Sequence, residues 1–186
     1  MTYYGGKELA ASFRTVRNNT IQIAEEIPEE SYSFRPSPDS RSIGETLAHI
    51  ATVTAFQTYV HENQIDSLTK VNFNEYLQKS RAEEDRLRTK AEIVAALKRA
   101  GEKFAQLLDS LPESFLSQSV GMMPGAQPAA KSRLEMLLSA KEHEMHHRGQ
   151  LMVMQRMVGM TPHLTRQMQE RMAQQAAQAA RATATR

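Results

Sequence analysis

SRLEMLLSAKEHEMHHRGQLMVMQRMVG, residues 132–159, is the stretch of sequence that decides the fold. Apolar residues recur at three- and four-residue spacing on both sides of a histidine-rich centre, a pattern typical of one buried helical face. Ser132 and Glu135 have the spacing of a capping box, which begins a helix, and Gly159 is a residue type that often ends one. The segment therefore predicts one long helix.

The same signals begin two further helices, at Ser42 with Glu45 and at Thr89 with Glu92. An earlier helix carries apolar residues at helical spacing and is closed by Pro28. The expected long helices span residues 7–26, 42–59, 89–111 and 132–159. Four helices with long crossovers predict an all-α fold, a four-helix bundle.

Polar, turn-rich segments connect these helices. Residues 62–88 are expected to include a short charged helix around 75–86, and residues 119–130 form a Gly/Pro-rich loop. The alternating pattern of a β-strand is not evident. We interpret residues 1–163 as one bundle domain and residues 164–186 as an Ala/Gln-rich tail, either helical or disordered.

Composition excludes several classes of protein. No apolar run approaches the ~18 residues of a membrane span, and the opening MTYYGGKELAASF does not resemble a signal peptide, so a cytoplasmic location is expected. The formal charge of +2 is concentrated in the tail, which leaves a near-neutral body without a face suited to nucleic-acid phosphates. Because cysteine is absent, any metal ion must be bound by nitrogen and oxygen ligands.

A histidine pair on the last long helix is the principal candidate site. His143 and His147 are four residues apart, so both imidazoles can reach one ion. The alternative is that both rings hydrogen-bond to the backbone or to carboxylates. His49, among core-type residues of another helix, is the candidate third ligand, since bundles build metal sites from facing helices. Gln150 shares the face of the pair and is a candidate for positioning a nucleophile, or else packs against the ligands.

Other polar residues near these positions have competing interpretations. Glu45 either orients a ring nitrogen of His49 or, as the spacing favours, caps its own helix with Ser42. His146 is expected to face solvent beside the pair, with an alternative role as a ligand in place of one member. His61 and His163 are expected at the surface.

Residues 143–147 also match the His-Glu-x-x-His pattern of zinc proteases, with Glu144 as the general base. Glu170 lies downstream at a plausible distance for a third ligand, but within the Ala/Gln-rich tail. The sequence offers no strand edge to receive a peptide, and the longer pattern fails because Gly149 falls one position early. The protease interpretation is therefore the weakest.

Three segments form a recognisable combination: HEMHHRGQL (143–151), MVGMTP (157–162) and, upstream, SFRPSPDSRSIGETLAHI (33–50). Together they resemble the motifs of the DinB/YfiT-like family of metal-dependent enzymes. The character of residues 71–97 fits as well, and most of residues 8–163 is covered.

The resemblance implies a bundle with up-down-down-up connectivity that forms homodimers. It also implies a divalent ion, zinc or nickel, held by His49, His143 and His147. Characterised relatives include transferases and isomerases that use a low-molecular-weight thiol, which this cysteine-free chain would have to take from outside.

The leading functional hypothesis is a metal-dependent enzyme for a small-molecule substrate, in which the ion activates water or a low-molecular-weight thiol. The first case gives a hydrolase and the second a thiol transferase. The alternative is a non-enzymatic, stress-associated bundle in which a closed metal site stabilises the fold.

Overall fold

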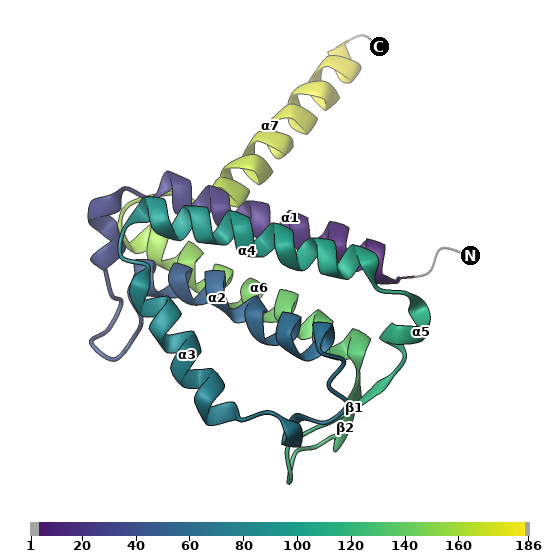
Figure 1. Cartoon of the computed structure of the whole chain (residues 1–186). Coiled ribbons are helices and arrows are strands. Elements are labelled where there is room, and N and C mark those ends of the chain that lie inside the picture. The colour runs from purple at the N-terminus through teal and green to yellow at the C-terminus, as the bar shows by residue number, and fades with distance from the viewer. Residues whose placement is uncertain (1–3, 185–186) are drawn as a thin grey trace.

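Four long helices form the body of the protein in a computed structural model that describes residues 4–184. They are α1 (Gly6–Glu26), α2 (Ile43–Glu62), α4 (Lys90–Ser110) and α6 (Arg133–Met157). Helices α1 and α2 each pack against both α4 and α6, so the order around the bundle is α1, α4, α2, α6 (Figure 1). The four-helix bundle expected from the sequence is confirmed.

The connectivity follows from two close contacts. At the start of α1, a Cβ added to Gly6 would lie 2.5 Å from the carbonyl oxygen of Leu108, near the end of α4, so these helices are antiparallel. The chain crosses back through α3 (Phe73–Arg86), which makes α2 and α4 parallel, and Lys103 lies 3.7 Å from Glu62 near their C-terminal ends. The order is up-down-down-up, as Figure 1 shows.

Short elements complete the connections. They are the 3-10 helices η1 (Glu29–Ser33) and η2 (Leu68–Lys70), the short helix α5 (Glu113–Leu116), and the strands β1 (Ser119–Gly121) and β2 (Ala130–Ser132). The strands pair antiparallel, with Val120 opposite Lys131. This hairpin was not predicted, because three-residue strands are too short to show an alternating pattern.

Most helix boundaries agree with the capping signals. Both bonds of the capping box are present at Ser42 and at Thr89, and Gly159 has the positive φ of +82° that ends α6. The third box is only half formed. Ser132 accepts a bond from the backbone N–H of Glu135, but the Glu135 carboxylate pairs with Lys131 at 3.0 Å.

A buried ion pair lies between the two larger apolar clusters of the core. Arg17 of α1 and Glu144 of α6 are 2% and 0% exposed, and Arg17 Nε and Nη2 donate to the carboxylate at 2.9–3.0 Å. The same guanidinium donates to the carbonyl oxygens of Leu97 on α4 and Ile50 on α2. One side chain thus links all four helices. Hydrophobic clusters lie on either side of it along the bundle.

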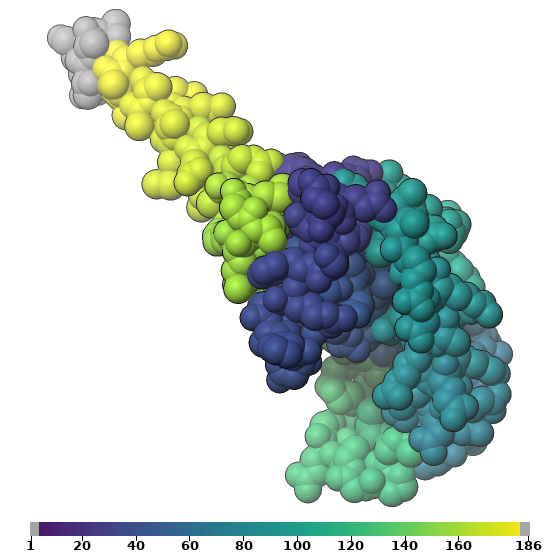
Figure 2. All heavy atoms as spheres, turned by 90° about the vertical axis from the view of Figure 1, so that its left-hand side faces the viewer, coloured from purple at the N-terminus to yellow at the C-terminus, as the bar shows by residue number. Residues whose placement is uncertain are grey.

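Helix α7 (His163–Ala184) leaves the bundle as a single projecting helix (Figures 1 and 2). Of the two expectations for the tail, the helical one holds, although residues 185–186 lie outside the described part of the chain. Over residues 4–184, no helix combines the length and the apolar character needed to cross a membrane.

Candidate metal centre

The packing of α2 against α6 brings three histidines together. His143 and His147 lie one turn apart on α6, and His49 faces them from α2. One ligand nitrogen from each ring can be chosen so that all three lie within 4.8 Å of one another. The ring centroids are 4.5–5.1 Å apart, and each pair of rings is nearly perpendicular.

Hydrogen bonds orient two of the rings. His49 Nδ1 lies 2.9 Å from a carboxylate oxygen of Glu84, and His147 Nδ1 lies 2.7 Å from the amide oxygen of Gln150. Both oxygens are acceptors, so each Nδ1 carries a hydrogen, and Nε2 is the nitrogen of each ring that can ligate a metal ion. This arrangement is the one in which ligating histidines are held in metalloproteins.

The donor set fits a divalent ion. The Nε2 atoms of His143 and His147 face each other at 3.0 Å, and His143 Nδ1 is buried with no hydrogen-bond partner within residues 4–184. Gln150 fixes a hydrogen of His147 on Nδ1. In the neutral ring, the Nε2 atom of His147 therefore has only a lone pair to offer. Three convergent imidazole nitrogens are a set of ligands that could hold a transition-metal ion.

Burial favours the neutral form of the two α6 rings, His143 and His147. It lowers the pKa of His143 to about 4, with smaller contributions from His147 and His49, and it is also the main cause of the lowered pKa of His147. Neutral imidazole is the form that binds metal ions, so near pH 7 both rings of α6 are ready to act as ligands.

The remaining candidate residues have structural contacts. Glu45 caps α2, where its carboxylate accepts from the Ser42 backbone at 3.0 Å, as the spacing favoured. His146 is exposed and accepts a 3.2 Å bond from the Gln150 amide. Gln150 therefore contacts two histidines, and its role in positioning a nucleophile stays a prediction.

The protease interpretation has no support in the geometry. Glu144 is fully buried and both of its carboxylate oxygens are bound by Arg17, so it is not placed to activate water at the histidines. Glu170 lies on the exposed part of α7.

Two surface expectations were wrong. His61 is 2% exposed, because its Nδ1 donates to the carbonyl oxygen of Gln57 and its ring packs beside Phe115. His163 is 1% exposed, with Nε2 3.2 Å from the side-chain oxygen of Asn19. Burial lowers the pKa of both rings. Each lies at a helix end that the sequence suggested was solvated but that another element covers.

Glu84 is the site residue that the sequence did not indicate. It belongs to α3, within the polar connection for which no specific signal was found, and it also accepts a 3.3 Å bond from Thr52. Its neighbours are charged as well, so only the packing of α3 on α2 distinguishes it.

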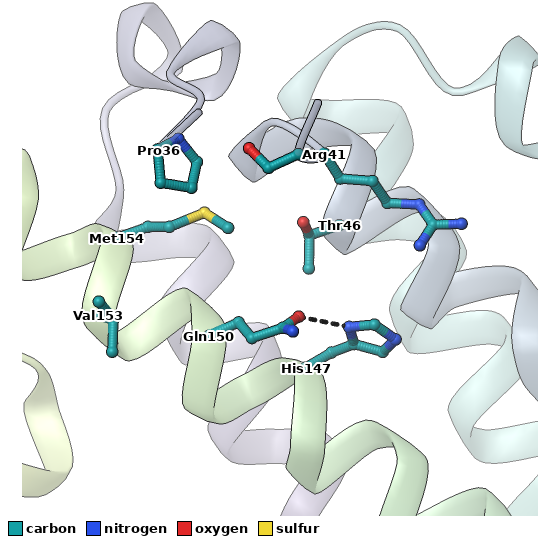
Figure 3. A pocket seen from close by; sticks show the side chains of 8 residues that line it. Pro36, Arg41, Thr46, His147, Gln150, Val153 and Met154 are labelled. Carbon is teal, nitrogen blue, oxygen red and sulfur yellow. Dashed lines mark hydrogen bonds between the residues drawn. The ribbon is translucent and has the colours of Figure 1, made fainter. Parts of the chain in front are cut away.

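A pocket of about 360 Å³ opens beside His147 (Figure 3). Its walls come from the loop before α2, from the first turns of α2 and from the last turns of α6. The lining residues are Pro36, Ser40, Arg41, Thr46, His147, Gln150, Val153 and Met154. A small molecule in this pocket would lie against one of the candidate ligands.

Comparison with known proteins connects this site to a family. The model of the DinB superfamily matches residues 12–151, which include all three histidines. The chain is 28% identical over 156 residues to the uncharacterized protein YjoA of Bacillus subtilis, covering 83% of this chain and 91% of YjoA.

Solved structures agree. The crystal structure of YjoA, described as a DinB-like protein, superposes with a TM-score of 0.62 at 25% identity and covers 83% of this chain and 94% of that one. A DinB-like protein from Bacillus cereus gives a TM-score of 0.63 at 18% identity, with 83% and 93% coverage, and supports the fold alone.

Proposed function

Because this chain belongs to the DinB superfamily, we propose that it is a metal-dependent enzyme whose divalent ion is held by His49, His143 and His147. The observation that carries the proposal is the convergence of three imidazoles, two of them oriented through Nδ1 by Glu84 and Gln150. Hydrogen bonds at the far ring nitrogen are characteristic of histidines that ligate metals.

The proposed chemistry depends on the coordination positions of a bound ion that the three histidines would not fill. A bound zinc or nickel ion would lower the pKa of coordinated water or of a coordinated thiol, and so generate a nucleophile near neutral pH. The protein's own contribution is to keep His143 and His147 neutral by burial, to orient His49 and His147 by hydrogen bonds, and to offer the adjoining pocket to a small substrate. Since the chain contains no cysteine, a thiol would come from solution. The homodimer and the cytoplasmic location stay predictions.

The experiment uses untagged protein loaded with cobalt, which reports its ligands by visible absorption. We expect one ion per chain, and a new sulfur-to-metal absorption band when a small thiol is added. Loaded wild-type protein should then accelerate attack of that thiol on an alkylating electrophile, or hydrolysis of an ester, and His147→Ala should not. If the spectrum of the bound ion did not change on addition of thiol or other ligands or on a change of pH, the metal ion would have a structural role and not a catalytic one.

Glu84 gives a second prediction. Glu84→Gln is expected to weaken zinc affinity about 10- to 100-fold, because the amide is a poorer acceptor for the Nδ1 hydrogen of His49. Competition with a chromogenic chelator measures the change. Glu83→Gln is the matched control, since its exposed carboxylate pairs with Arg86 on the same helix. Equal affinities in the two variants would show that Glu84 does not orient the ligand.

A further inference from the structure

The pocket beside the three histidines has two chemically different parts. Pro36, Val153 and Met154 form an apolar wall, whereas Arg41 lies on the opposite rim and reaches over Thr46 on the side of His147 (Figure 3). Among the described lining residues, Arg41 is the one that carries a permanent charge. A ligand that fills the pocket would therefore meet an apolar surface and a guanidinium.

Arg41 differs from the nearby Arg35 because its guanidinium N–H groups are available to bind a ligand. Arg35 donates to the Ser40 carbonyl oxygen and pairs with the Glu45 carboxylate. Arg41 is exposed, and no side-chain hydrogen bond or ion pair ties it to another residue within 4–184. An arginine fork without a protein partner is suited to bind a carboxylate or phosphate through two parallel bonds.

The two nearest glutamates have other hydrogen-bond partners. Glu45 is bound by Arg35 and by the Ser42 backbone, and Glu84 is bound by His49 and Thr52. Arg41 also lines a second, smaller groove together with Glu45, Glu84 and Asp85, and this groove does not include His147.

We propose that Arg41 is the specificity-determining residue of this pocket and selects small molecules that carry a carboxylate next to a short apolar chain. The carboxylate binds the guanidinium, and the rest of the molecule occupies the pocket between His147 and the apolar wall of Val153 and Met154. The inference rests on the proposed function in taking this pocket as the approach to the ion. It names the class of substrate or thiol that the site accepts.

The test compares two thiols of the same chain length, 3-mercaptopropionate and the uncharged 3-mercaptopropan-1-ol. Binding is followed in metal-free protein through the methyl resonance of Met154, which lines the pocket and is assigned with Met154→Leu. For wild-type protein we expect the carboxylate to bind at least about tenfold more tightly, because charge-assisted hydrogen bonds are the stronger kind. Arg41→Gln should reduce the preference to about twofold or less by removing the fork.

Arg99→Gln is the matched control, because Arg99 is also exposed but lies on α4, outside the pocket. It should retain the wild-type preference, which rules out a general effect of net charge. Equal binding of the two thiols to wild-type protein, or a preference that survives Arg41→Gln, would overturn the proposal. Inorganic phosphate is titrated separately, and tighter binding of phosphate than of the carboxylate would overturn the assignment of ligand class.

The readout is independent of the ion. A charge preference at Arg41 in a protein that binds neither zinc nor nickel would refute the proposed enzyme but leave the anion site standing. Metal binding without any preference for the carboxylate would refute the anion site but leave the proposed enzyme standing.

Discussion

Arg17→Met is expected to lower the free energy of unfolding by about 3–5 kcal/mol, the cost of leaving one member of a buried ion pair unpaired. Glu144 is fully buried, and Arg17 supplies all of the hydrogen bonds identified at its carboxylate within the described chain. Removing the guanidinium would strand a carboxylate between two apolar clusters. Urea unfolding followed by far-ultraviolet circular dichroism measures the change.

Two further variants make this prediction specific. Arg14→Gln, also on α1, removes exposed pairs with Glu102 and Asp109, and is expected to cost less than about 1 kcal/mol. Arg17→Met combined with Glu144→Leu should recover much of the lost stability, because an apolar replacement of both partners leaves no buried charge. If Arg17→Met were no more destabilising than Arg14→Gln, the ion pair would not have the structural role assigned to it.

The Arg17 side chain of the buried pair has little freedom to move. A Cβ added to Gly101 of α4 would lie 2.6 Å from Cγ of Arg17, so the helices approach closely at this layer. The guanidinium also donates to Leu97 and Ile50 carbonyl oxygens, on α4 and α2. Since Glu144 lies next to His143 in sequence, the pair fixes the rotation of α6 that turns the histidines toward α2.

Zinc is expected to stabilise the wild-type protein by about 4 kcal/mol when free zinc is about 1,000 times its dissociation constant, provided that zinc does not bind the unfolded chain. His49→Ala, His143→Ala and His147→Ala should each lose most of this gain, because two imidazoles hold an ion far less tightly than three. Denaturant unfolding at fixed, buffered concentrations of free zinc, repeated with nickel, measures the difference.

His146→Ala is the control for the zinc experiment. His146 is exposed on the same turn of α6, and it contacts the site through a 3.2 Å bond from Gln150. This variant should keep nearly all of the zinc-dependent stabilisation. A wild-type unfolding curve that zinc and nickel leave unchanged would contradict the three-histidine site. A loss in His146→Ala equal to that in His147→Ala would contradict the choice of ligands.

Much of the fold could be predicted because its signals are local. The capping residues Ser42 and Thr89 and the helix-ending Gly159 act within one or two turns of the chain, where sequence spacing equals spatial spacing. The site was partly predictable for the same reason, since His143 and His147 must share a face on any helix. The hairpin of β1 and β2 was missed because three residues contain too little pattern.

Partners far apart in sequence needed the tertiary structure. Glu84 is one of several acidic residues in a charged helix, and only the packing of α3 on α2 brings it to His49. His61 and His163 looked solvated, because the residues that cover them come from other elements. Arg41 became a candidate only when its lack of a protein partner was seen beside the pocket.

By itself, the sequence determined the four long helices, most of their caps and the shared face of the two histidines of α6, because each depends on the 3.6-residue period and on contacts within a turn. The tertiary structure alone decided which polar side chains are buried together. Glu144 appears in the sequence as part of a protease pattern, yet in the fold it is the buried partner of Arg17, 127 residues away. The role of a carboxylate depends on the partner that satisfies it, and packing between helices, not spacing along one helix, selects that partner.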